Sequence, residues 1–135
     1  MGRWWDTVAV KDLIDRTIAA HPIDRARIYL TGISMGGFAT WNLLKEHPNF
    51  IAAAVPICGA GDPLAVTRFK SVPVWAFHGD KDDAVPAQRS IDMVEALKKV
   101  EGKIKFTLYK DVTHDSWTET FENPALYTWL LEQKK

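Results

Sequence analysis

The chain of 135 residues has a single cysteine, Cys58, and no excess of either charge, with 17 Lys and Arg against 17 Asp and Glu. One cysteine excludes an intramolecular disulfide and leaves the redox compartment open. A balanced charge creates no basic field that would attract nucleic acid or an anionic membrane surface. We therefore expect neither of these partners.

Long apolar runs and targeting signals are also missing from the sequence. No stretch is long and apolar enough to span a bilayer, and no apolar region followed by a small-residue cleavage site marks a signal peptide. A cytoplasmic location is expected if the chain is complete. No repeat, low-complexity segment or Gly/Ser linker divides the chain, so we expect one domain over residues 1–135.

Apolar patterns predict strands and helices that alternate along the chain. The predicted strands cover residues 28–31, 51–57, 72–77 and 104–109. The predicted helices cover residues 7–20, 87–100 and 124–133, with a further helix from residue 38 to about residue 47. This alternation predicts an α/β fold with about four parallel strands flanked by helices. Residues 59–71 are predicted to form a loop, which is the only candidate for a lid.

The most informative motif is Gly32-Ile33-Ser34-Met35-Gly36, between a predicted strand and a predicted helix. G-x-S-x-G in this position is typical of a nucleophile elbow, a sharp turn that exposes the serine oxygen. A Cβ atom at Gly32 or Gly36 is expected to collide with the neighbouring strand or helix. The turn also directs the amide of Met35 toward the place where a substrate oxyanion would develop.

A nucleophilic serine needs a base, and the base needs an orienting acid. His114 follows the last predicted strand and is the candidate base. The loop after strand 72–77 holds three candidate acids, Asp80, Asp82 and Asp83, and the residues alone do not choose between them. Because functional groups in parallel sheets gather at the carboxyl ends of strands, we expect these side chains to meet Ser34. The order Ser, Asp, His is the order expected in an α/β-hydrolase.

Four segments carry a more specific resemblance, residues 27–37, 54–59, 75–79 and 114–117. From about Asp12 to the carboxyl terminus, the chain resembles the α/β-hydrolase superfamily, in its branch of predicted peptidases, phospholipase/carboxylesterases and dienelactone-hydrolase-like esterases. The resemblance implies ester hydrolysis, with Ser34 as the nucleophile and His114 as the base. The family's spacing places the acid on Asp82, with Asp83 as the runner-up.

The amino-terminal part departs from this family. Relatives carry several strands before the elbow, and a His-Gly loop that supplies a second oxyanion amide, whereas residues 1–26 contain neither. The resemblance therefore predicts a truncated or minimal fold, the carboxyl-terminal catalytic portion of a hydrolase. Strand 28–31 would then lie at an open sheet edge. Such edges pair with other chains, so we expect homo-oligomers through this strand, or a cover formed by Trp4 and Trp5 with the first helix.

Together these features predict a serine carboxylic-ester hydrolase for short acyl chains, acting through an acyl-enzyme with no cofactor and no metal. Cys58 and Trp117 are candidate substrate-pocket residues, although a core role explains each equally well. His78 is assigned a structural role, because it precedes the glycine at the end of its strand, where packing is expected. A metal cluster of His78, Asp80, Asp82 and His114 is not expected, because no metal-ligand spacing supports it. Two alternatives are a serine peptidase of the prolyl-oligopeptidase type, and a non-catalytic fragment that needs missing strands or a partner chain.

Overall fold

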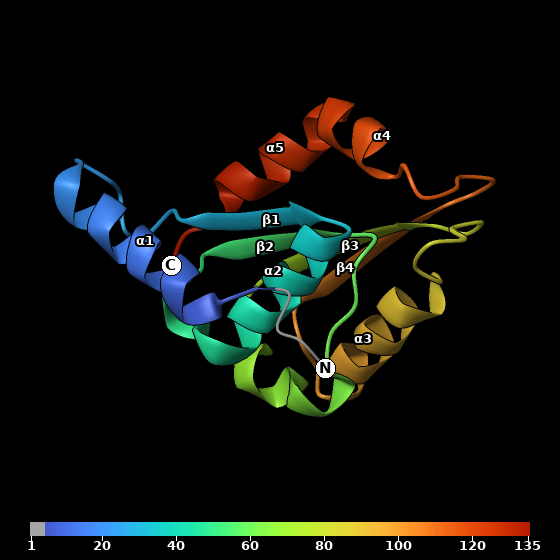
Figure 1. Cartoon of the computed structure of the whole chain (residues 1–135), viewed down its shortest axis with the longest axis horizontal. Helices are drawn as coiled ribbons and strands as arrows, with labels where there is room; N and C mark the ends of the chain where they lie inside the picture. Colours follow the sequence, from blue (N-terminus) through green and yellow to red (C-terminus); the bar gives the residue numbers. More distant parts are fainter. Residues whose placement is uncertain (1–4) are drawn as a thin grey trace.

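The computed structural model describes residues 5–135, which form one parallel sheet between two layers of helices (Figure 1). The strands are β1 (Tyr29–Ile33), β2 (Ala53–Ile57), β3 (Val74–Gly79) and β4 (Ile104–Tyr109). They lie in the order β1-β2-β3-β4, and all neighbouring strands are parallel. This confirms the predicted four-stranded α/β fold. Because the strands are parallel, their four carboxyl ends lie at the same end of the sheet.

Four of the helices agree with the sequence prediction to within a few residues. These are α1 (Thr7–Ala20), α2 (Met35–Glu46), α3 (Gln88–Lys99) and α5 (Pro124–Glu132). The sequence pattern missed α4 (Trp117–Glu122) and the 3-10 helices η1 (Pro48–Phe50) and η2 (Pro63–Phe69). Such short helices escape detection because they do not span enough turns for a periodic apolar pattern to develop.

The sheet separates two apolar cores. Helices α2 and α3 cover one face with η2, and α4 and α5 cover the opposite face (Figure 1). Side chains along β3 alternate between the layers, so Val74 and Ala76 belong to the first core and Trp75 and Phe77 to the second. Every residue of β2 and β3 is buried, as expected when helices cover both faces of a parallel sheet.

Residues 59–71 contain the helix η2 where a loop was predicted, and two of its side chains reach the core. Val66 and Phe69 of η2 are only 3% and 1% exposed, and the Phe69 ring lies 6.1 Å from the ring of Trp41. The side chain of Asp62 caps the start of η2 by accepting a hydrogen bond from the amide of Leu64. A segment anchored in this way is not free to close over a site as a lid.

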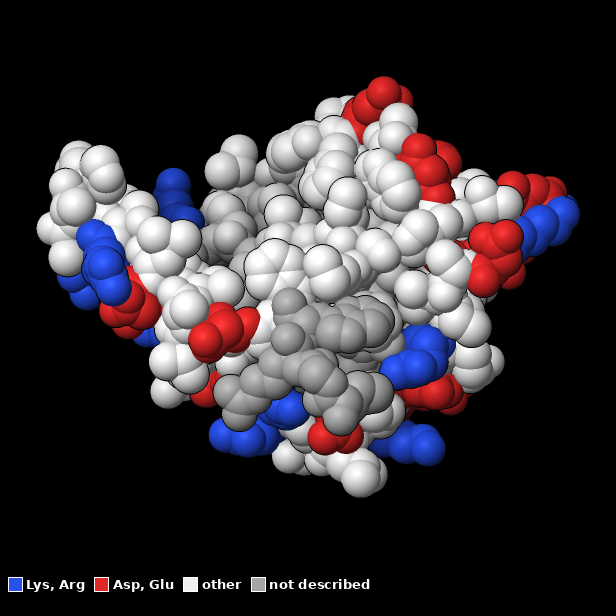
Figure 2. All heavy atoms as spheres, viewed as in Figure 1, with Lys and Arg blue, Asp and Glu red and all other residues white. Residues whose placement is uncertain are grey.

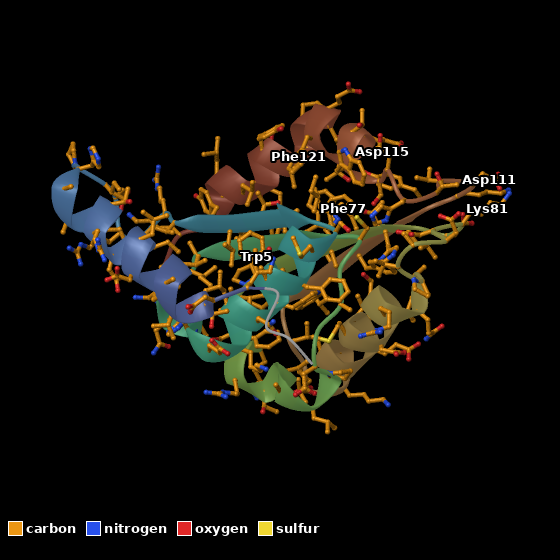
Figure 3. All side chains as sticks on the ribbon, viewed as in Figure 1. Trp5, Phe77, Lys81, Asp111, Asp115 and Phe121 are labelled. Atoms are coloured by element: carbon orange, nitrogen blue, oxygen red, sulfur yellow. The ribbon has the colours of Figure 1, made fainter. Side chains whose placement is uncertain are left out.

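Strand β1 lies at an edge of the sheet, where no other strand of residues 5–135 pairs with its outer side. Helix α1 leaves part of its apolar side exposed, since Val8 and Leu13 are both 65% exposed, whereas Ile14 and Ile18 are half-buried. The indole of Trp5, whose side chain is labelled in Figure 3, donates a hydrogen bond to the carbonyl of Met35 at 2.9 Å. Trp5 also lines a cavity of about 140 Å³ with Leu30 of β1. Trp4 lies outside the described residues. Of the predicted cover, the structure places Trp5 beside Leu30 of β1.

The surface agrees with the balanced charge of the sequence. Acidic and basic side chains are interspersed on the face seen in Figure 2. Across residues 5–135, no helix combines the length and apolar character that a membrane span requires.

We expect copies of the chain to associate through the outer side of β1, because an unpaired strand edge is a template for another strand. Sedimentation at increasing concentration would show a growing dimer fraction, and hydrogen exchange would slow at the amides of residues 29–33. The central strand β3 serves as the internal control, since its amides are paired on both sides. A monodisperse monomer whose β1 amides are already protected would contradict the association.

Candidate active site

Ser34 lies at the turn between β1 and α2 in a strained backbone conformation, with φ 53° and ψ −114°. A positive φ is uncommon for a residue with a side chain and is maintained by surrounding contacts. One such contact is the hydrogen bond from the Ser34 amide to the carbonyl of Ile57, at 2.9 Å, which ties the turn to the end of β2. The sharp turn that the motif predicts is therefore present.

The glycines of the motif have different roles. A Cβ atom at Gly32 would lie 2.1 Å from the carbonyl oxygen of Gly36, which confirms the predicted collision. A Cβ atom at Gly36 would meet nothing within 4 Å, so the prediction for that residue is wrong. The second close approach is at Gly37, where a Cβ atom would lie 2.6 Å from the carbonyl oxygen of Ile57. The helix thus approaches β2 one residue later than the motif suggests.

Met35 is the first residue of α2. Amides in the first turn of a helix have no partner within the helix, and the helix dipole adds partial positive charge there. The Met35 amide therefore belongs to a helix start that favours negative charge, next to the Ser34 hydroxyl.

The three candidate acids differ in burial and in hydrogen bonding. The side chain of Asp82 is completely buried, whereas Asp80 and Asp83 are exposed. Oδ1 of Asp82 accepts hydrogen bonds from the amides of Ala84 at 2.9 Å and Val85 at 2.8 Å. Asp82 is thus fixed by its own loop, and neither neighbouring carboxylate has this arrangement.

The loop after β4 crosses the end of β3 and carries His114 toward Asp82. The amide of Lys81 donates to the carbonyl of Val112 at 2.9 Å, and a Cβ atom at Gly79 would lie 2.2 Å from that same carbonyl oxygen. On the surface, Lys81 forms an ion pair with Asp111 at 2.6 Å, where both side chains project from the tip of the two loops (Figure 3).

His114 joins Ser34 and Asp82 in one hydrogen-bonded chain. Its Nδ1 lies 2.8 Å from Oδ2 of Asp82, and its Nε2 lies 3.0 Å from Oγ of Ser34. An ionised carboxylate only accepts hydrogen bonds, which assigns the proton to Nδ1 and leaves Nε2 to accept from the serine hydroxyl. The three residues predicted from separate strand ends are therefore together, in the geometry that proton transfer from Ser34 requires.

The surroundings of Asp82 keep it ionised. Burial raises the pKa of this carboxyl, but the hydrogen bonds from His114 and from the amides of Val85 and Ala84 outweigh burial, and the pKa lies below its usual range. The negative charge is consequently available to stabilise an imidazolium on His114.

Cys58 and Trp117 both lie close to this chain of residues. Cys58 is completely buried with φ 42°, and burial raises the pKa of its thiol. The ring of Trp117 is half-buried and meets the ring of His114 edge-on, with centroids 5.5 Å apart. Cys58 thus has the character of a small core residue, whereas Trp117 forms a wall beside the imidazole.

Among residues 5–135, one group of side chains has donor atoms close enough together for a metal ion. The thiol of Cys58, the carboxylate of Asp82 and the imidazole of His114 have ligand atoms within 4.8 Å of one another. A metal bound to Nδ1 of His114 would have to replace the proton that now joins this ring to Asp82. The hydrogen-bonded arrangement therefore suits proton transfer better than metal binding.

His78 is a contact of the site that the sequence did not reveal. It is completely buried, and its Nε2 lies 3.2 Å from Oδ2 of Asp82. In the sequence, only its place four residues before Asp82, at the end of a buried strand, indicated that His78 could contact this carboxylate.

Comparison with known proteins identifies the group to which this fold and site belong. Residues 6–129 match the family described as Phospholipase/Carboxylesterase. The chain belongs to this family. The α/β-hydrolase resemblance of the sequence is thereby confirmed.

Individual relatives agree with this assignment. The chain is 35% identical, over 133 residues, to a bifunctional acetylxylan esterase/xylanase of Neocallimastix patriciarum, covering 92% of this chain and 18% of that protein. The crystal structure of a thermostable esterase superposes with a TM-score of 0.92 at 40% identity, covering 95% of this chain and 36% of that one. An acylamino-acid-releasing enzyme of Arabidopsis thaliana is 31% identical over 59% of this chain and 11% of its own length. The chain thus spans only a minor part of each relative.

The two glycines Gly32 and Gly36 provide a matched pair for a stability test. We expect Gly32→Ala to lower the free energy of unfolding by about 2–3 kcal/mol, because the new methyl group would overlap the Gly36 carbonyl. Gly36→Ala is expected to be neutral or to stabilise by about 0.5–1 kcal/mol, because alanine favours helix and the site is open. Chemical denaturation of both variants measures the difference. Equal effects would show that the elbow relaxes around either methyl group.

Asp82 and Asp83 provide a second matched pair. We expect Asp82→Asn to slow fluorophosphonate labelling of Ser34 by about 10³–10⁴-fold, because an amide no longer holds His114 in the required tautomer. Asp83→Asn is expected to label at the unaltered rate, since that side chain is exposed. Intact mass spectrometry over time gives both rates. The reverse ranking would assign the acid to Asp83.

Proposed function

We propose that this chain is a serine carboxylic-ester hydrolase that acts through a Ser34–His114–Asp82 triad. The observation that carries the proposal is the unbroken chain of hydrogen bonds, 3.0 Å from Ser34 to His114 and 2.8 Å from His114 to Asp82. Family membership and the thermostable esterase, which is similar over 95% of this chain, support the same reaction class.

In the proposed reaction, Nε2 of His114 removes the Ser34 proton as Oγ attacks the carbonyl carbon of the ester. The resulting oxyanion accepts a hydrogen bond from the Met35 amide at the start of α2. Asp82 holds the imidazole and stabilises its positive charge. The imidazolium then protonates the leaving alcohol, and the C–O bond of the ester breaks to give an acyl-enzyme.

Water completes the cycle. His114 takes a proton from a water molecule, which attacks the acyl carbon, and the second oxyanion collapses with return of the proton to Ser34. The products are a carboxylic acid and the free enzyme.

Met35 supplies one oxyanion donor, and loss of a single donor in such sites typically costs about 10²–10³-fold in rate. A site with the Met35 amide as its single oxyanion donor is therefore expected to be slower than a site with two donors.

The substrates proposed for this site are esters of short acyl chains. With η2 packed into the core, residues 59–71 provide no lid to enclose a long chain. Trp117 is proposed to form one wall of the substrate site, next to His114. Cys58 is proposed to bound the inner end of the site, since it belongs to the buried cluster on which Trp117 packs. The similarity to an acetylxylan esterase favours acetyl groups among the short acyl chains.

A serine peptidase is the second candidate. The similarity to an acylamino-acid-releasing enzyme supports it, and the proposed triad would serve peptide cleavage equally well. The third candidate, a non-catalytic fragment, is consistent with the small share of each relative that the chain covers.

Release of nitrophenol from p-nitrophenyl acetate, butyrate and octanoate by the purified protein tests the proposal. We expect serine-dependent turnover that is fastest with the two shorter esters and is lost in Ser34→Ala. Ser71→Ala is the matched control, because Ser71 is an exposed serine outside the site. Acetate release from acetylated xylan is measured in parallel. It tests whether this chain accepts the polymer named for the similar acetylxylan esterase.

The same assay separates the alternatives. Cleavage of an acyl-peptide nitroanilide without ester turnover would favour the peptidase. A folded wild-type protein that neither turns over any ester nor reacts with a fluorophosphonate would overturn the proposal and favour the fragment.

A further inference from the structure

His78 is the one completely buried histidine of residues 5–135, and the proposed reaction does not use it. It lies near the end of β3, inside the sheet. Its Nδ1 lies 2.7 Å from Oγ of Ser90 in α3, and its Nε2 lies 2.7 Å from the carbonyl oxygen of Val85. The ring therefore connects three segments: the central strand, helix α3, and the loop that carries Asp82.

The contacts of the ring assign its protons. Nε2 faces the carbonyl of Val85 and lies 3.2 Å from Oδ2 of Asp82, and both of these oxygens only accept hydrogen bonds. Nε2 therefore carries a hydrogen, and Nδ1 accepts from the hydroxyl of Ser90. Burial lowers the pKa of His78, in agreement with a neutral ring.

We propose that His78 is a positioning residue that holds Asp82 in the orientation needed by His114. The proposal rests on the triad proposed above. His78 acts at two points, through the carbonyl of Val85 and beside Oδ2 of the carboxylate itself. It touches no part of the Ser34–substrate reaction, and its effect passes through Asp82.

The first point of action is the loop. The amide of Val85 donates to Oδ1 of Asp82 at 2.8 Å, and the carbonyl of the same residue bonds to His78 at 2.7 Å. Val85 is thus held on both sides, by the carboxylate and by the buried ring. Without the ring, the half-buried carbonyl of Val85 would be left without this partner, and the amide that orients Asp82 would lose its support.

The second point of action is the carboxylate. Oδ1 is fixed by the amides of Ala84 and Val85, while Oδ2 faces His114 at 2.8 Å and His78 at 3.2 Å. These four groups occupy the acceptor positions of the carboxylate from every side, so that rotation about its Cβ–Cγ bond would break favourable contacts. A carboxylate fixed in this way keeps the imidazole of His114 in one tautomer and one orientation. A precise site needs supporting residues of this kind, which hold the reacting side chains in place.

A pair of substitutions of similar shape tests the proposal. Glutamine places an N–H close to the position of the histidine Nε2, whereas methionine fills a similar volume with no donor. We expect His78→Met to lower kcat for p-nitrophenyl acetate about 10–100-fold, because the half-buried Val85 carbonyl and Oδ2 of Asp82 lose their donor, with KM changed less than about 2-fold. His78→Gln is expected to restore most of the loss. Active sites are counted by fluorophosphonate labelling, so that kcat refers to competent molecules only.

Proton NMR gives a readout that does not depend on turnover. The hydrogen of His114 Nδ1, held against a buried carboxylate, should give a far-downfield signal, assigned by its loss in Asp82→Asn. We expect this signal in the wild type and in His78→Gln, and a weaker or shifted signal in His78→Met. If the methionine variant does not fold, His78→Asn is used in its place. The shorter amide of asparagine reaches toward Ser90 and leaves the Val85 carbonyl unpaired.

The outcomes separate this proposal from the proposed function. A wild type with the downfield signal but no turnover would refute ester hydrolysis and leave the positioning role to be judged by the signal in the variants. Unchanged kcat and an unchanged signal in His78→Met would overturn the positioning role. Equal losses of kcat per active site in the glutamine and methionine variants would overturn it as well, since only bulk or packing would then matter.

Discussion

The close packing of the turn at Ser34 against β2 is the constraint on which the site depends. A positive φ at a residue with a side chain costs about 1–3 kcal/mol and persists only where its surroundings determine it. Here the hydrogen bond from Ser34 to Ile57 and the absence of side chains at Gly32 and Gly37 provide those surroundings. Any loosening of this contact would move the serine oxygen away from His114 before it affected the rest of the sheet.

The other half of the site depends on two loops that are joined to each other. The amide of Lys81 bonds to the carbonyl of Val112, so the segment that carries Asp82 and the segment that carries His114 share a backbone contact. The buried face of the first loop rests on His78, and its exposed tip forms the ion pair of Lys81 with Asp111. An exposed ion pair contributes little to stability, so the buried contacts dominate in fixing the distance between Asp82 and His114.

Much of this arrangement was predictable because it follows from local pattern. Strands β2 and β3 are continuous apolar runs, and the order of Ser34, the aspartate loop and His114 follows from their places after successive strands. The choice of Asp82 over Asp83 depends on the amides of Ala84 and Val85, which composition does not reveal. Gly36 was misjudged because the direction of α2 decides which glycine meets β2. The exposed apolar residues of α1, including Leu13, show that periodicity predicts a helix but not what covers it.

The separation of the site residues along the chain has a consequence for how the protein folds. Ser34 and His114 are 80 residues apart in sequence, and Asp82 and His114 are 32 apart, yet each pair is joined by a hydrogen bond. Contacts of such long range form late, after the loss of chain entropy has been overcome. In the proposed triad, Ser34 would be activated only after β4 has docked on β3, because His114 follows β4 in the chain. An intermediate that lacks the last strand would then show no reactivity at Ser34. The rate at which Ser34 becomes reactive would then report the rate of the final step of folding.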